Sequence, residues 1–127
     1  MSKREENTLH FVGELNPEIV NMVGQPLPHG KVYQSNGLIV HIQKRHPNIV
    51  NQMHLIPDIL ANPDYVGKDP SKPNSMELVK VYNDNLLISI TLDPDEEYLY
   101  VSTIYDINQS KLVRRVNSGR LIPYIKN

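Results

Sequence analysis

The sequence predicts an α+β domain in which N-terminal helices pack on a roughly four-stranded antiparallel sheet. Three observations predict this class: apolar residues recur at helical spacing between residues 48 and 61, apolar and β-branched runs alternate with turns after residue 75, and the composition is globular. Of the 127 residues, 39% are hydrophobic and 21% are charged, which is the balance of one soluble domain. Helices followed by an antiparallel meander are typical of α+β proteins.

The composition also excludes several classes of protein and site. The chain has no cysteine, which excludes disulfides, thiol nucleophiles and thiolate zinc sites. No stretch approaches the ~20 apolar residues that a membrane-spanning helix needs, and the opening MSKREENTLHF is too polar for a signal peptide. We therefore expect a cytoplasmic protein with no membrane partner.

We expect the chain to consist of an N-terminal extension, residues 1–30, and a compact domain, residues 31–127. In the extension, Thr8–Leu15 is predicted to form a short strand. Pro17–Val23 is predicted to form a short helix, because proline favours the first helical position and the residues after it are mostly apolar. Residues 24–30 (GQPLPHG) are predicted to be a loop, since two prolines and two glycines disfavour a regular hydrogen-bonded ladder.

The compact domain is predicted to begin with a brief strand, Val32–Gln34, and a helix. Ser35 or Asn36 can cap this helix, and it is expected to run to about His46, where Pro47 stops it.

A second helix is predicted from about Asn48 to Ala61. Its apolar stripe consists of residues at positions i, i+4, i+7 and i+11, namely Ile49, Met53, Ile56 and Leu60. Pro57 is expected to weaken or kink this helix, because proline lacks the amide donor. Residues 62–74 contain three prolines and are predicted to form a turn-rich connection.

Strands are predicted from residue 75 onward. Met76–Tyr82 and Leu86–Leu92 are separated by the tight turn Asn83–Asn85, which indicates a hairpin. A second turn, Asp93–Glu96, precedes a third strand, Glu97–Tyr105. Two more segments complete the chain: residues 108–117, a helix or an irregular excursion, and residues 121–125, a fourth strand.

The densest polar cluster of the sequence lies between His41 and His46. On a continuous helix, His41 shares one face with Lys44 and Arg45, by their i, i+3 and i+4 spacing. His46 would lie about 140° away from His41, so the two imidazoles diverge unless the helix loosens before Pro47. A purely structural alternative is that His46 interacts favourably with the helix dipole at the C-terminus.

The third strand carries a second candidate cluster. Strict alternation would place Leu99, Val101, Thr103 and Tyr105 on one face, with the hydroxyls of the last two available to a ligand. The alternative is that β-branched and aromatic residues simply favour strands. The candidate phosphate contacts elsewhere are basic residues, namely Lys80, Lys111, Arg114 and Arg115.

The charges are unevenly distributed along the chain. Residues 31–54 carry three basic and no acidic side chains, and residues 98–127 carry five basic and one acidic. Between them, residues 55–97 carry three basic and nine acidic side chains. The two basic blocks can meet in the fold as an anion-binding face; the alternative is that these charges are dispersed and solvated.

This inventory of side chains fits acid–base chemistry on a phosphodiester. It contains His, Lys, Arg, Thr and Tyr, with no thiolate and no concentrated carboxylate cage for magnesium. A base can remove the ribose 2′-OH proton, an acid can protonate the leaving 5′ oxygen, and cations can stabilise the charge between them. The same inventory fits a site that only binds RNA.

Four segments together resemble a known family. They are VYQS (residues 32–35), LIVHIQKRHP (38–47), IPDILANPDYV (56–66) and VSTIY (101–105), followed by a late basic segment with Gly119. Their order resembles the phage-associated nuclease domains of the barnase–EndoU–colicin–RelE superfamily, the PBECR group. The similarity covers about residues 31–125.

The resemblance implies helices packed on a four-stranded antiparallel sheet, and RNA cleavage on the concave face without a metal or cofactor. It also implies catalytic roles for His41, His46, Thr103 and Tyr105, with Arg114 or Arg115 at the late basic position. The expected function is thus that of a metal-independent ribonuclease, in the role of a toxin or phage effector.

Expected partners are RNA, with tRNA as one candidate, and an immunity or antitoxin protein. Two alternatives stay open: an inactive module that binds RNA or protein through the same face, and a phosphoribosyl- or ADP-ribose-handling enzyme.

Overall fold

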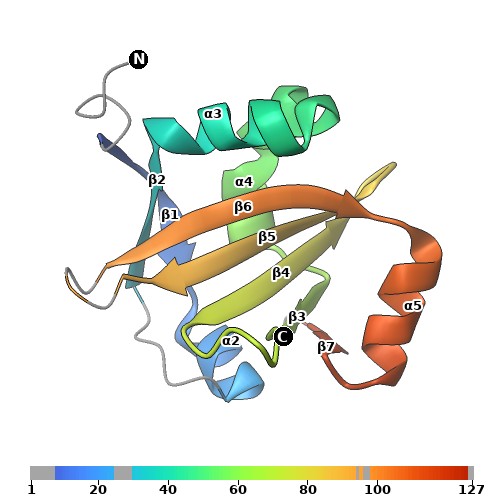
Figure 1. Ribbon diagram of the computed structural model, residues 1–127. Helices are drawn as coiled ribbons and strands as arrows, with labels where there is room; N and C mark the ends of the chain where they lie inside the picture. Colours follow the sequence, from blue (N-terminus) through green and yellow to red (C-terminus); the bar gives the residue numbers. More distant parts are fainter. Residues whose placement is uncertain (1–7, 25–29, 94, 96–97, 126–127) are drawn as a thin grey trace.

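The computed structural model describes residues 8–24, 30–93, 95 and 98–125. These residues form seven strands and five helices (Figure 1). The strands are β1 (Leu9–Leu15), β2 (Gly30–Ser35), β3 (Tyr65–Gly67), β4 (Ser75–Val81), β5 (Asn85–Leu92), β6 (Leu99–Ile107) and β7 (Leu121–Pro123). The helices are α2 (Pro17–Val23), α3 (Asn36–Arg45), the 3-10 helix η1 (Pro47–Leu55), α4 (Ile56–Ala61) and α5 (Gln109–Asn117).

The strands form one mixed sheet in the order β1-β2-β6-β5-β4-β3-β7. The pair β2–β6 is parallel, and the other neighbouring strands are antiparallel. The α+β class is therefore confirmed, but a four-stranded antiparallel sheet with only N-terminal helices is wrong. The described sheet has seven strands, and α5 follows β6. Pairing between strands that are distant in the sequence leaves no local periodicity. The number of strands predicted from the sequence is therefore too low.

The N-terminal strand and helix form as predicted. Helix α2 starts where the Asn16 side chain accepts a hydrogen bond from the Glu18 amide at 2.9 Å, which satisfies one free amide of the first turn. Ile19 and Val20 are buried in the main core together with Leu15 of β1. The boundary at residue 30 stays a prediction, although the described part of residues 1–30 shares that core.

The second predicted helix is wrong in its first half. Residues 47–55 form the 3-10 helix η1, and only residues 56–61 form the α-helix α4. Pro57 cannot donate an amide hydrogen bond to the preceding turn, so a regular α-helix does not continue through it, and α4 begins at Ile56 with the proline in its first turn. All four residues of the predicted apolar stripe are buried in the main core: Ile49, Met53, Ile56 and Leu60.

The predicted hairpin is confirmed, since β4 and β5 pair antiparallel from Ser75↔Thr91 to Val81↔Asn85. A helix at 108–117 is also found, with Asn108 accepting a hydrogen bond from the Lys111 amide at 2.8 Å. The closing strand β7 is shorter than predicted and ends at Pro123. Most of the predicted loop at 24–30, part of the turn Asp93–Glu96 and the start of the third strand lie outside the described residues.

Strict alternation along β6 is also wrong, because the register shifts opposite Ser89 and Ile90 of β5. Ser89 pairs with Thr103, whereas Ile90 pairs with Val101, so Ser102 is an extra residue in β6. Such a bulge reverses the alternation beyond it.

Side chains before and after the bulge therefore point to different faces of the sheet than strict alternation would predict. Leu99, Val101 and Ile104 are buried in the main core. Thr103 and Tyr105 pair with Ser89 and Leu87, on the opposite face of the sheet.

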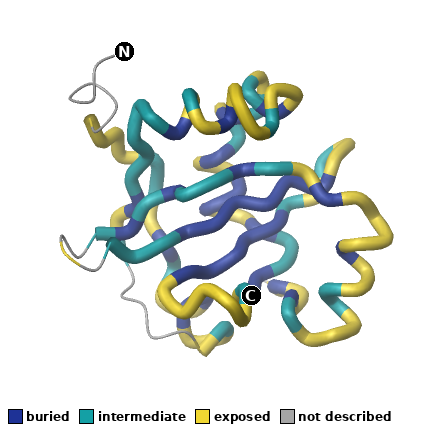
Figure 2. The backbone as a smooth tube through the Cα atoms, in the orientation of Figure 1, coloured by how far each residue is buried: buried dark blue, intermediate teal, exposed yellow. Residues whose placement is uncertain are grey.

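The two faces of the sheet are covered differently. The main core lies against α2, α3, η1 and α4, while a smaller cluster of Val79, Leu87, Ile107, Leu112 and Leu121 lies beneath α5. Strands β4 and β5 are buried along most of their length, and the helices expose their outer sides (Figure 2). Within the described residues no helix is long and apolar enough to cross a membrane.

Candidate functional site

A cleft of about 690 Å³ opens between the C-terminal half of α3, the bulged part of β6 and the start of α5. It lies on the same face of the sheet as α5. Its lining residues come from four segments: His41, Arg45, His46, Lys72, Ser102, Thr103, Tyr105, Asp106 and Lys111. The cleft thus contains all four predicted catalytic residues and two of the predicted phosphate contacts, Arg45 and Lys111.

The end of α3 brings the two histidines to the same cleft. His46 has left the helix, with φ −141° and ψ 61°, while its amide still donates to the Ile42 carbonyl at 2.8 Å. Pro47 disfavours the helical conformation at the residue before it. The 140° divergence expected on a continuous helix therefore does not occur, and both imidazoles line the cleft.

His46 is held against the sheet by an aromatic contact. Its ring stacks on that of Tyr105, with centroids 5.4 Å apart and an interplanar angle of 25°. Both residues are half-buried. Because the ring of Tyr105 is fixed on a central strand paired with β5, the stack sets the orientation of the imidazole at the floor of the cleft.

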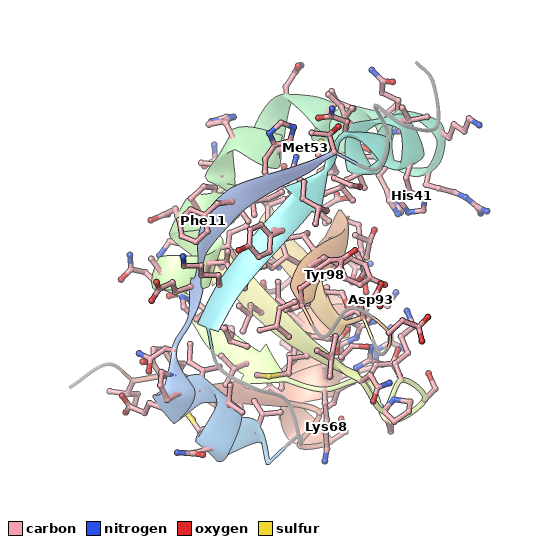
Figure 3. All side chains as sticks on the ribbon, turned by 90° about the vertical axis from the view of Figure 1, so that its left-hand side faces the viewer. Phe11, His41, Met53, Lys68, Asp93 and Tyr98 are labelled. Atoms are coloured by element: carbon pink, nitrogen blue, oxygen red, sulfur yellow. The ribbon has the colours of Figure 1, made fainter. Side chains whose placement is uncertain are left out.

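His41 and Arg45 occupy the mouth of the cleft. They lie one turn apart on α3, both are exposed, and both line the cavity. Figure 3 shows the His41 side chain projecting from the lower side of α3, which is the side on which Tyr98 lies. An imidazole is the side chain best suited to exchange a proton near neutral pH, and at this position it is accessible to a bound substrate.

The bulge in β6 supplies the hydroxyls of the cleft. Ser102 and Thr103, the residues at the bulge, both line the cavity. The Ser102 hydroxyl accepts from Thr91 Oγ1 at 3.0 Å and donates to the Ser89 carbonyl at 3.2 Å. These bonds fix Ser102 and thereby the shape of the bulge.

The charged side chains that line the cleft are mostly cationic. Arg45 comes from the first basic block, Lys111 from the second, and Lys72 from the connection between β3 and β4. Among the lining residues described, Asp106 is the single acid. Three cations around one open cavity suit a phosphate-bearing ligand.

Four predicted phosphate contacts lie outside this cleft. Lys44 is exposed on α3 but does not line the cavity. Lys80 donates to the Asn62 carbonyl at 2.8 Å and pairs with Leu86, whose side chain belongs to the main core. It therefore lies on the opposite face of the sheet. Arg114 and Arg115 line a neighbouring hollow of about 400 Å³ together with Lys111.

Arg115 belongs to an ion network that the sequence analysis missed. Buried Glu77 of β4 accepts two hydrogen bonds from Arg120, at 2.8 and 2.9 Å, and lies 3.6 Å from Arg115 Nη1. The bond to Glu77 raises the pKa of the Arg120 guanidinium. Asp69 lies 3.4 Å from Arg120, and a hydrogen bond from the Ser71 side chain lowers the pKa of Asp69.

One signal in the sequence could have pointed to this network. Glu77 is the only acid within the apolar strand 75–81, and a buried acid needs a cationic or hydrogen-bonding partner. For Lys72 no such signal exists, because its position depends on how the connection at 68–74 folds. Over the residues described, no group of three or more His, Asp or Glu could hold a metal ion.

The sequence was compared with known proteins. Residues 10–114 match the family described as phage-Barnase-EndoU-ColicinE5/D-RelE like nuclease 3, PBECR3. The matched range starts in β1 and ends in α5, so it contains all the residues of the cleft. No curated protein and no solved structure matches the chain.

Proposed function

The chain belongs to the phage-Barnase-EndoU-ColicinE5/D-RelE like nuclease family, PBECR3, and from that premise we propose that it is a metal-independent endoribonuclease. The observation that carries the proposal is the convergence of His41 and His46 with Thr103 and Tyr105 in one cationic cleft. Two imidazoles can supply a base and an acid, and hydroxyls can hold the phosphate oxygens between them.

The proposed reaction is a transesterification. One imidazole removes the proton of the ribose 2′-OH, and the 2′ oxygen attacks the adjacent phosphorus. The bond from phosphorus to the 5′ oxygen then breaks, and the second, protonated imidazole gives its proton to that oxygen. The products are a 2′,3′-cyclic phosphate and a 5′-hydroxyl, with no net gain or loss of protons in the step.

We assign the essential acid–base role to His41, because its ring is exposed at the mouth of the cleft. His46 is the second proton-transfer residue, and its stack on Tyr105 fixes its direction. A general acid or base contributes about 10²–10⁴-fold to the rate.

The cations supply charge stabilisation in this proposal. Arg45, Lys72 and Lys111 surround the cavity, and negative charge grows on the phosphate oxygens as the 2′ oxygen attacks. Preorganised positive groups at that place stabilise the transition state more than the ground state. The role proposed for these side chains is one that other nucleases give to a metal ion.

The test is incubation of the purified protein with mixed RNA in EDTA, with analysis of the new ends. The parent protein should cut and leave 2′,3′-cyclic phosphates. His41→Ala and His46→Ala should each lose about 10²–10⁴-fold in rate, with an unchanged melting temperature. His54→Ala is the matched control, because His54 is exposed and outside the cleft. Parental cleavage by both cleft variants contradicts the proposal.

A non-catalytic RNA-binding role is the second candidate. It is favoured by the three cations of the lining, which can bind phosphate whether or not a proton is transferred. Binding of RNA without new ends would identify this role. A toxin role and a tRNA target are further parts of the proposal, tested by growth arrest and by tRNA cleavage after expression of the parent chain but not of His41→Ala.

A further inference from the structure

Four aromatic rings form a continuous row where β1, β2 and β6 lie next to one another. The ring centroids are 6.2 Å apart for Phe11–Tyr33, 6.3 Å for Tyr33–Tyr98 and 5.9 Å for Tyr98–Tyr100. Phe11 is 57% exposed, and the three tyrosines are half-buried. Phe11 and Tyr98 lie on the side of the molecule that faces the viewer in Figure 3. We call these four residues the aromatic row.

The rings of the row do not stack face to face. Their interplanar angles are 70°, 86° and 55°, compared with 25° for the stacked pair His46–Tyr105. None of the rings in the row is covered by a parallel neighbour within the row. Since Phe11 is exposed and the three tyrosines are only half-buried, the row presents aromatic surface on which another planar group can lie.

The row is continuous with the cleft along β6. Tyr100 pairs with Thr91, and Thr91 and Ser102 line a groove of about 410 Å³. This groove shares Lys72 and Ser102 with the cleft. Tyr100 is three residues before Thr103, a distance of about 10 Å along a strand, so a ligand in the cleft needs to extend only a short way to reach it.

We propose that the aromatic row is a base-stacking subsite for an unpaired RNA strand whose phosphates lie in the cleft. This inference rests on the proposed ribonuclease function. Aromatic side chains bind bases of any sequence by stacking, and a cationic groove beside them follows the backbone. Arg45 and Lys72 provide that groove. A duplex hides the faces of its bases, so the row selects single-stranded RNA.

The test uses a probe that the protein cannot cut. A mixed-sequence 2′-O-methyl oligoribonucleotide of about 12 nucleotides lacks the attacking hydroxyl, and this length is in the range that single-strand binding sites cover. Tyr33→Leu and Tyr100→Leu keep an apolar side chain but remove the ring. Each should weaken binding about fivefold or more, with the parental melting temperature and an unchanged dependence on salt.

Two control variants and one control probe separate stacking from charge. Tyr82→Leu removes a half-buried tyrosine that packs against the main core, and it should bind like the parent. Lys72→Ala should reduce the slope of log affinity against log salt by about 0.7, as expected for one phosphate of a single strand. A probe whose nucleotides lack bases should bind the parent more weakly than the intact probe does. The parent and Tyr100→Leu should have the same affinity for this abasic probe.

The outcomes distinguish this inference from the proposed function. If the parent cleaves RNA but both row variants bind the probe as tightly as the parent, the row is not a subsite, while the nuclease proposal stands. If the row variants weaken binding but the parent does not cleave, the subsite stands and the nuclease proposal fails. Row variants that keep RNA affinity but change the sedimentation of the protein overturn the inference in favour of a protein interface. No binding of the probe by the parent also overturns it.

Discussion

Replacing Glu77 with glutamine tests the ion network that connects β4 to α5 and to residues 118–120. The Glu77 side chain is 4% exposed, and its two oxygens accept hydrogen bonds from Arg120 at 2.8 and 2.9 Å. Arg115 Nη1 is also buried, and among the described residues it has no hydrogen-bond partner. Glutamine keeps the size and one acceptor oxygen but removes the charge that both guanidinium groups face.

These contacts set the expected loss of unfolding free energy. Removing one partner of a buried ion pair destabilises a protein by about 3–5 kcal/mol. Arg120 is 24% exposed and keeps Asp69 at 3.4 Å, so the expected loss is at the lower end, about 3 kcal/mol of unfolding free energy. In a domain of this size, about 4 °C corresponds to 1 kcal/mol, so the melting temperature should fall by about 12 °C.

Urea unfolding followed by circular dichroism measures this loss directly. The midpoint should decrease while the slope against urea stays at the parental value, because the folded state remains compact. Glu14→Gln is the matched control, since Glu14 is exposed on β1 and a surface change should stay within about 0.5 kcal/mol. A loss below about 1 kcal/mol in Glu77→Gln would refute the reasoning that this carboxylate compensates buried charge.

Three further changes have defined outcomes. Gly67→Ala should lower the melting temperature strongly, because an added Cβ would lie 1.8 Å from the Arg120 carbonyl oxygen; a parental melting temperature would contradict this. The Tyr82 hydroxyl donates to Asp58 and lowers the pKa of that carboxyl from its ordinary 3.8. This stabilisation is present above the unfolded-state pKa and is lost as pH falls through the folded-state pKa. Tyr82→Phe should therefore cost up to about 1 kcal/mol in urea unfolding at pH 7 and progressively less as the pH falls below the ordinary pKa of the carboxyl, and a cost that does not change with pH would exclude this linkage. Arg114→Ala should reduce the salt slope of RNA binding by about 0.7 without changing stability; an unchanged slope would show that Arg114 makes no phosphate contact.

The parts of the fold that could be predicted are those with a local physical cause. Pro17 at the first helical position and the glycine that follows the helix determine α2 within residues 17–23. The turn at 83–85 and the apolar runs beside it determine the hairpin of β4 and β5. In each case the signal and the element occupy the same short stretch of chain.

The parts that could not be predicted depend on distant residues. Strand β3 has three residues in a segment rich in proline, and it exists because it pairs with both β4 and β7. The parallel pairing of β2 with β6 consists of two residue pairs, Val32↔Leu99 and Tyr33↔Tyr100. Such short contacts depend on the position of the rest of the sheet, and no periodicity in the sequence predicts them.

In the candidate site, too, the residue types could be predicted from local motifs but their spatial arrangement could not. The candidate catalytic residues came from two motifs, and His41, His46, Thr103 and Tyr105 all line one cleft. Their relative directions were not predictable from regular geometry. A continuous helix would have turned His46 away, and Lys72 reaches the cavity from a connection that has no regular structure to extrapolate from.

Two irregularities explain why the site forms at this place. Residue 46 leaves the helical conformation before Pro47, which directs the second imidazole into the cleft. The bulge at Ser102 turns Thr103 and Tyr105 together to the face opposite Leu99 and Val101, while Ile104 joins those two residues in the core. Regular strand geometry would leave both hydroxyls on the core face, and a continuous helix would direct one of the two histidines away from the cleft. The bulge interrupts the pairing of β5 with β6, which costs stability, and both irregularities bring polar side chains to a single cavity. Their coincidence around one cleft supports the binding or catalytic use that we propose for it.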